Sequence, residues 1–151
     1  MNAYAVLKLI HVLAVITWIG GALTMTLLTW RITRAGDPGA LATLQRHGAF
    51  IGPAVAGPAS LLVLLTGIGM VVVGRVDPAA LWVQSGMAGI VVHFLFGPLV
   101  LRRAGIRLGQ ATASGDTTRI AEARRRLGRL SAVYLILMLS VVSVMVLKPT
   151  I

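Results

Sequence analysis

Two histidines in this sequence have the side-chain type and the position to bind a metal or a ligand. His11 lies in the apolar run LKLIHVLAVITWIGG, and His93 lies in the apolar run GIVVHFLFG. An ionisable side chain at membrane depth is costly, and it usually faces the interior of a helix bundle and marks a functional site. The third histidine, His47, follows Arg46 in a more polar stretch, and we expect it at a membrane–water interface.

Imidazole groups on facing membrane helices have the chemistry that a b-type haem requires. A neutral histidine nitrogen binds haem iron axially, and an apolar wall around the iron sets its redox potential and excludes water. We therefore interpret His11 as an axial ligand of haem b and His93 as the second metal ligand. Lys8, one turn before His11, is placed to pair with a haem propionate, and Trp18 lies on the same helical face.

Glycines share the helical face of His93 and extend the predicted pocket. Gly86 and Gly89 precede His93 by seven and four residues, so all three lie on one side of a helix. Glycine lets either a flat, bulky group or another helix approach the backbone closely. We expect Gly86, Gly89 and Trp18 to line the cofactor site.

A second interpretation of both histidines needs no cofactor. A histidine inside a membrane bundle can form a hydrogen bond to a neighbouring helix, which stabilises the bundle by about 1 kcal/mol. The expected depths of His11 and His93, counted from the same side of the membrane, differ by about 9 Å at a rise of about 1.5 Å per residue. This difference counts against a simple axial pair, so both interpretations stay open.

The composition explains why these side chains are expected in a membrane. Of the 151 residues, 57% are hydrophobic and only 12% are charged, and the mean hydropathy is +0.89. Soluble domains usually carry about 25% charged residues, so this chain has too little polar surface for a water-soluble fold. Its length suits a single domain over residues 1–151. It contains no cysteine, which excludes disulfides, thiolate metal ligands and cysteine catalysis.

Four apolar runs are each long enough to cross the hydrocarbon core, which takes about 20 residues. Because lipid offers no hydrogen bonds to the backbone, these runs are expected to be helices. The first run is expected to be a retained span and not a cleaved signal peptide, since no charged segment precedes it. The predicted fold is an all-α bundle of four transmembrane helices, at about residues 3–30, 50–74, 79–101 and 130–147.

The arginines predict the orientation of this bundle. Eleven of them lie in the first and third connections, and only Arg75 lies in the second. Basic connections mark the cytoplasmic side, so we expect both termini outside, in a bacterial inner (cytoplasmic) membrane. The two basic connections are expected to bind the anionic lipids of the inner leaflet. Nucleic acid is excluded as a partner, because no aromatic residues are interleaved with the arginines of the third connection to stack on bases.

Local signals predict further helix and two bends near the basic connections. Asp37 followed by Pro38 is typical of a helix start, and Asp116 is a second candidate N-cap. The stretch GPAVAGPAS repeats a Gly-Pro-Ala step, and a Gly-Pro pair recurs at residues 97–98. Proline removes a backbone hydrogen bond and kinks a helix. We therefore expect bends in the second and third spans, with either a tilted helix start or a widened cavity beneath the bend of the second.

Three stretches carry a family resemblance: LKLIHVLAVITWIGGAL, TGIG and MVLKP, at residues 7–23, 66–69 and 145–149. They resemble the bacterial four-helix membrane proteins of the family DUF2269, to which no reaction is assigned. The superfamily that this resemblance indicates includes the copper-resistance D membrane domain and the HemJ-type protoporphyrinogen oxidases, and the latter resemble this chain. The latter resemblance implies a b-type haem held partly by His11, with Lys8 and Lys148 as the other matching positions. TMTLLTWRI follows GGAL where HemJ-type proteins have proline, arginine and aromatic residues.

An enzyme active site is poorly supported by the remaining residues. The four acidic residues all lie between the predicted spans, and no nucleophile has an evident base. We therefore favour a small membrane protein that binds haem b and serves electron transfer, or a subunit of a membrane redox complex. A redox partner or quinone, and a homodimer or larger complex, are the associated expectations. The alternatives left open are a cofactor-free structural or assembly protein, a copper-handling protein and a HemJ-type porphyrinogen oxidase.

Overall fold

Two residues mark where the first helix begins and ends. A computed structural model describes residues 2–148 of the chain, and its first helix, α1, spans Ala3–Ala35. The Asn2 side chain accepts a hydrogen bond from the backbone N–H of Tyr4 and so caps the helix start. Gly36 ends the helix with a φ of 71°, a left-handed conformation that glycine adopts without steric cost.

Three helical segments continue one another to form the second rod of the bundle: α2 (Pro38–Ile51), η1 (Gly52–Ala56) and α3 (Gly57–Val73). Asp37 is the N-cap of this rod and accepts a hydrogen bond from the backbone N–H of Ala40. Pro38 occupies the first turn, where a missing N–H costs nothing. The helix start predicted at this Asp-Pro pair is confirmed.

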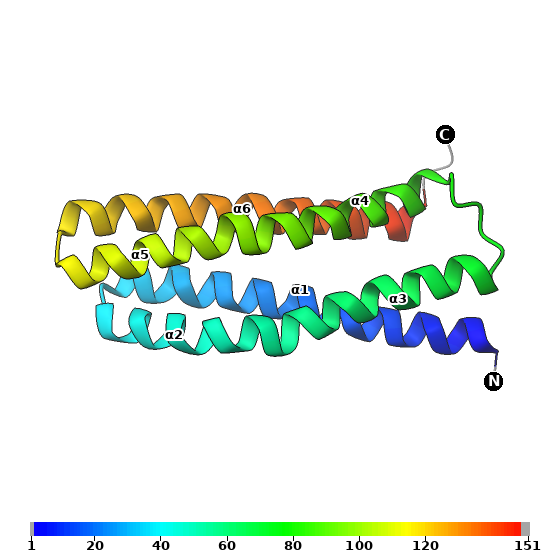
Figure 1. The fold of residues 1–151 in the computed structure, drawn as a ribbon, viewed down its shortest axis with the longest axis horizontal. Coiled ribbons are helices and arrows are strands. Elements are labelled where there is room, and N and C mark those ends of the chain that lie inside the picture. Colours follow the sequence, from blue (N-terminus) through cyan, green and yellow to red (C-terminus); the bar gives the residue numbers. More distant parts are fainter. Residues whose placement is uncertain (1, 149–151) are drawn as a thin grey trace.

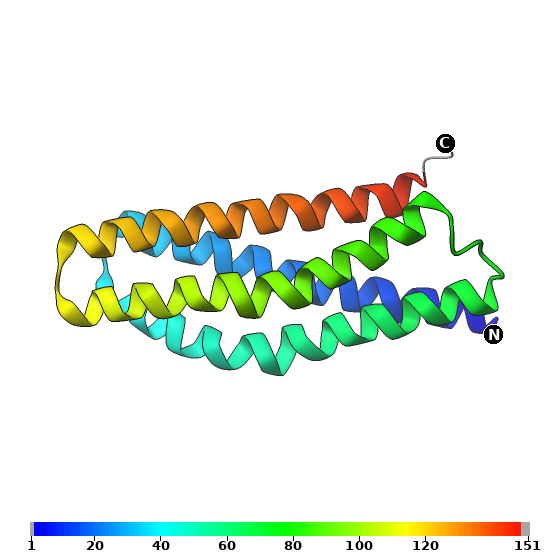
Figure 2. The ribbon, with the colours of Figure 1, turned by 45° about the horizontal axis from the view of Figure 1, so that its top comes forward.

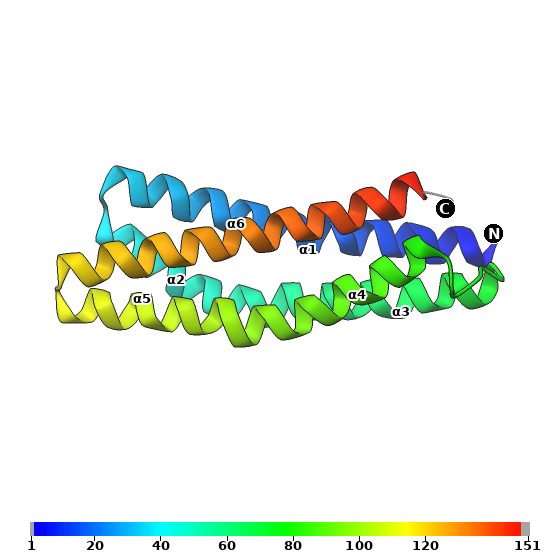
Figure 3. The same cartoon turned by 90° about the horizontal axis from the view of Figure 1, so that it is seen from above.

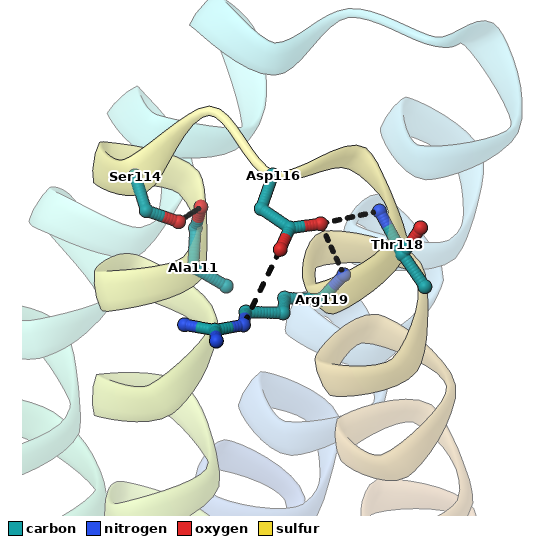
Figure 4. Close-up of polar contacts among 5 residues, drawn as sticks. All are labelled: Ala111, Ser114, Asp116, Thr118 and Arg119. Carbon is teal, nitrogen blue, oxygen red and sulfur yellow. Dashed lines mark hydrogen bonds and ion pairs between the residues drawn. The ribbon is translucent and has the colours of Figure 1, made fainter.

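The third and fourth rods are joined by a tight turn. The third rod consists of α4 (Leu81–Phe96), η2 (Gly97–Leu101) and α5 (Arg102–Ser114). The fourth rod is the single helix α6 (Thr117–Leu147). Figure 4 shows the turn between α5 and α6, where Asp116 accepts hydrogen bonds from the backbone N–H groups of Thr118 and Arg119. Asp116 therefore caps α6, as the sequence predicts.

Two of the three Gly-Pro pairs, at residues 52–53 and 97–98, begin a local widening of a helix that continues. The segments η1 and η2 are π-helical, and each begins with glycine followed by proline. Because proline has no N–H to donate to the preceding turn, a wider turn accommodates it inside a continuing helix. The bend predicted in the second span is confirmed, and Figure 2 shows it near η1. The third rod has the same local widening at η2.

Each of the four rods is long and apolar enough to cross a membrane, which confirms the predicted fold of four transmembrane helices. The rods contain 31 to 36 residues. This corresponds to about 46–54 Å of helix, whereas a hydrocarbon core is about 30 Å thick. Segments that the sequence placed in connections are therefore largely helical: α2, α5 and the first turns of α6. The capping residues extend these helices beyond the apolar runs.

Side chains from all four rods meet in one core near the middle of the bundle. Helix α1 packs most extensively against α3, and α6 runs beside α1, α4 and α5, as Figure 3 shows from above. The core contains these buried residues: Ala14, Trp18, Ala59, Val63, Ile90, Tyr134 and Met138. Large apolar side chains such as Leu9, Val72 and Val146 are exposed on the outside, as expected of a surface that contacts lipid.

The two ends of the bundle differ in charge. The turns at residues 36–37 and 115–116 lie at one end, whereas the start of α1, the loop 74–80 and the end of α6 lie at the other (Figure 1). Eleven arginines belong to residues 31–46 and 102–129, near the first end. We call this first end the basic end of the bundle.

Candidate functional site

His11 is buried and hydrogen-bonded between α1 and α3. Its Nδ1 lies 3.0 Å from Oγ1 of Thr66, and both residues are buried. The single hydroxyl proton of Thr66 is donated to the backbone carbonyl of Leu62, so Thr66 Oγ1 acts as the acceptor toward the histidine. His11 therefore carries its proton on Nδ1, which leaves the Nε2 lone pair free to bind a metal.

Two glycines of α3 let α1 approach closely at this level. A Cβ atom at Gly67 would lie 3.4 Å from Cε1 of His11, and one at Gly69 would lie 3.2 Å from Leu7. The edge of the imidazole formed by Nδ1 and Cε1 therefore rests against α3. The stretch TGIG thus supplies both the hydrogen-bond partner and the room for the ring.

His93 forms a second polar contact, between α4 and α6. Its Nδ1 pairs with the hydroxyl of Tyr134, and its ring lies edge-on to Trp18 of α1, with ring centroids 4.3 Å apart. His93 is half-buried, whereas Trp18 and Tyr134 belong to the buried core. This contact therefore joins three rods around one imidazole.

The two imidazoles do not form a pair in the described structure. His93 contacts Trp18, which follows His11 by about 10 Å along α1. Metal-bound imidazole nitrogens lie about 2 Å from their metal, so two axial ligands have to face each other closely. His11 is instead held on α3 and His93 on α6, each by its own hydroxyl group. The structure therefore brings Trp18 and His93 together and gives His11 a separate environment.

Gly86 and Gly89 contact α6. A Cβ atom at Gly89 would lie 2.9 Å from both γ-carbons of Val141, and one at Gly86 would collide with the end of the Met145 side chain. Of the two occupants that the sequence left open for these glycines, a flat ligand or a helix, a helix is the one observed. Their role in this structure is the close packing of α4 against α6.

The remaining candidate residues are exposed or lie near the ends of the rods. Lys8 is exposed near the start of α1, and His47 is exposed on α2, as expected for a residue near water. Nζ of Lys148 lies 4.8 Å from the centre of the Trp82 ring, a cation–π contact between the end of α6 and the start of α4. Pro149, which follows Lys148 in the stretch MVLKP, lies outside the described residues.

Sequence reasoning missed the two hydroxyl groups that hold the histidines. Thr66 and Tyr134 lie in runs that are apolar on every side, so hydrophobic periodicity does not show which of their residues face inward. The stretch TGIG pointed to Thr66 only through its family resemblance. Within residues 2–148, no group of three or more His, Cys, Asp or Glu side chains is arranged to hold a metal ion. The available ligand chemistry is that of single imidazoles.

Comparison with known sequences and structures leads to one family. No curated protein and no solved structure matches the chain. The family model of DUF2269, described as a predicted integral membrane protein, matches residues 5–149. This range covers nearly all of the four rods and includes both histidine contacts. The chain therefore belongs to the DUF2269 family of predicted integral membrane proteins.

Proposed function

We propose that this membrane protein binds one b-type haem, with Nε2 of His11 as an axial ligand, and serves electron transfer, alone or within a membrane redox complex. The observation that carries this function is the hydrogen bond between His11 Nδ1 and Thr66 Oγ1. Metal-ligating histidines usually donate their second ring N–H to a neighbouring acceptor, which fixes the tautomer and the ring orientation. His11 has this arrangement at a buried position inside an apolar bundle.

The contacts of His11 are those of an imidazole that could hold a haem iron by itself, and they do not fit a His11–His93 pair. Thr66 orients the imidazole and makes Nε2 a better electron donor. Lys8 supplies an exposed cation one turn along α1, which suits a propionate. When bound, the haem would supply an iron centre that exchanges one electron. His93 is not assigned to the iron, because Tyr134 and the core already engage its ring.

The optical spectrum of the purified protein tests this function directly. Wild-type protein produced with ample haem is expected to show a Soret band and, after chemical reduction, sharp α and β bands. His11→Ala is expected to lose these bands, because the axial nitrogen is gone. His47→Ala and His93→Ala are matched controls that are expected to retain them. Colourless wild-type protein, or full haem retention in His11→Ala, would contradict the assignment.

A cofactor-free structural role is the second candidate, and specific contacts favour it. Both imidazoles already form a hydrogen bond across helices, and α6 side chains fill the space at Gly86 and Gly89. In this role, an interhelical bond such as His11–Thr66 stabilises the bundle by about 1 kcal/mol. The described contacts favour neither copper handling nor porphyrinogen oxidation.

Thermal unfolding separates these two candidates. A haem that binds only the folded protein raises the unfolding temperature, because it stabilises the folded state by RT ln(1 + c/Kd), where c is the concentration of free haem. Two preparations of wild-type protein are compared, one produced with ample haem and one produced without it. The haem-binding function requires a higher unfolding temperature for the preparation with haem. A purely structural role of His11 leaves the two preparations identical, while His11→Ala lowers the unfolding temperature of both.

A further inference from the structure

A groove lies between α5 and α6 at the basic end of the bundle. Its main cavity has a volume of about 360 Å³, and a second cavity of about 180 Å³ continues it toward the apolar part of the rods. The two cavities share Ala104, Arg107 and Arg126 as lining residues, so they form one hollow, which we call the α5–α6 groove. The main cavity falls within the range of about 300–1,000 Å³ that is typical of small-molecule sites.

The end of the groove nearest the apolar runs is lined by hydrocarbon. Leu99, Val100 and Leu130 line it, at the level where the apolar runs of the third and fourth rods meet the first arginines. A ligand chain that lies along these residues passes directly into the hydrocarbon core of the membrane. This end of the groove therefore suits an acyl chain.

The middle of the groove is strongly basic. Arg107 and Arg126 line both cavities and Arg103 lines the second, and among the described lining residues the acidic one is Glu122. Neither cavity places another carboxylate beside these three guanidinium groups. Guanidinium groups bind phosphate oxygens through paired, charge-assisted hydrogen bonds. A phosphate in this part of the groove would offset the positive charge of these arginines.

The end of the groove at the α5–α6 turn is polar, with nearly balanced charge. Gln110 and Ser114 of α5 line it together with Glu122 and Arg119 of α6. Figure 4 shows that Arg119 is already paired with Asp116, with 3.3 Å between Nε and Oδ2. This end therefore offers hydrogen-bond donors and acceptors for hydroxyl groups, without the unpaired positive charge that a second phosphate would need.

We propose that the α5–α6 groove binds one anionic glycerophospholipid from the leaflet at the basic end. One acyl chain lies along Leu99 and Leu130, the phosphate lies between Arg107 and Arg126, and the headgroup hydroxyls extend toward the turn. A soluble phosphate ester has no group for the apolar end, and a zwitterionic lipid carries a cation toward the arginines. Basic connections attract anionic lipid in general; the groove adds a single, saturable site.

Native mass spectrometry of the detergent-solubilised protein measures this site. Dioleoylphosphatidylglycerol is the probe, dioleoylphosphatidylcholine is the zwitterionic control, and inorganic phosphate is the soluble competitor. The groove variant is Arg107→Gln combined with Arg126→Gln. The matched variant, Arg31→Gln combined with Arg46→Gln, removes two exposed arginines of α1 and α2 near the same end. Circular dichroism verifies that each variant is folded.

Wild type and the matched variant are expected to bind one phosphatidylglycerol with similar affinity. The groove variant is expected to bind it about 30-fold more weakly, given the usual contribution of each basic residue near anionic lipid. Phosphatidylcholine is expected to bind at least about tenfold more weakly than phosphatidylglycerol, and millimolar phosphate is expected not to displace the lipid.

Three results would overturn the site. Equal weakening in both variants shows diffuse attraction to the basic end, and equal binding of both lipids shows no selection for an anion. Displacement by phosphate shows a site for a soluble anion. The lipid and phosphate comparisons use wild-type protein, so they decide the question even where the groove variant does not fold.

Discussion

Thr66 determines which nitrogen of His11 carries the proton. Its hydroxyl proton is bonded to the carbonyl of Leu62, so its oxygen can only accept from the imidazole. Inside a membrane an unpaired polar group is costly, because no water is available to replace the partner. The same hydrogen bond therefore matters for a ligand role, through the free Nε2, and for a structural role, through the α1–α3 contact.

Replacement of Thr66 by valine tests this bond, because valine keeps the volume and removes the oxygen. Thr66→Val is expected to lower the free energy of unfolding by about 1 kcal/mol, the usual size of an interhelical hydrogen bond in a membrane. Thr66→Ser is the matched control, since it keeps the acceptor, and it is expected to lie closer to wild type. Denaturant unfolding in detergent micelles measures both. Identical stability of the valine and serine variants would show that the hydroxyl contributes nothing.

The histidines could be predicted from the sequence, but their partners could not. An ionisable side chain in an apolar run stands out by its chemistry alone, and both His11 and His93 face inward as that rule predicts. Thr66 and Tyr134 are ordinary residues of membrane helices. In runs that are apolar on every side, the sequence pattern does not show which residues face inward. Which hydroxyl meets which imidazole depends on helix pairing, and the sequence pattern does not contain that pairing.

The contact between α4 and α6 depends on two glycines with different neighbours. Gly89 faces both γ-carbons of Val141, a β-branched side chain with little freedom to move. Gly86 faces the end of Met145, a flexible side chain that can turn aside. The same added methyl group is therefore expected to have unequal effects at the two positions.

Gly89→Ala is expected to lower the free energy of unfolding by about 1–3 kcal/mol, as overpacking of a rigid contact does. Gly86→Ala is expected to have a clearly smaller effect. Combining Gly89→Ala with Val141→Ala restores the space and is expected to recover part of the lost stability. Unfolding in detergent micelles measures all three variants. A greater loss at Gly86 than at Gly89 would contradict this description of the α4–α6 contact.

An apolar run predicts that a span exists, but it does not predict the full length of the helix. Hydrocarbon thickness sets the length of the run, whereas capping residues set the length of the helix. Asp37 and Asp116 mark the helix starts correctly, so both caps were readable in the sequence. The continuation of the third rod through α5 could not be predicted in this way, because its arginines are equally compatible with a loop and with a helix.

At the scale of the whole molecule, the bundle is polarised along its length. Its apolar runs lie toward the end with the loop 74–80, and its arginines lie near the other end (Figure 1). Rods of 31 to 36 residues are longer than a hydrocarbon core is thick, so two or more turns of each rod extend beyond it. We therefore expect the extra turns at the basic end to lie among lipid headgroups and water.

The orientation of this polarised bundle is the remaining prediction, and the absence of native cysteines makes it simple to test. By the positive-inside rule, the eleven arginines at the basic end predict that this end faces the cytoplasm. The single substitutions Ala35→Cys, Ala113→Cys and Ala79→Cys replace exposed side chains, the first two at the basic end and the third at the other. In sealed right-side-out vesicles, a membrane-impermeant maleimide is expected to label only Ala79→Cys until the membrane is permeabilised. The opposite labelling pattern would place the arginines outside and move the proposed lipid site to the outer leaflet.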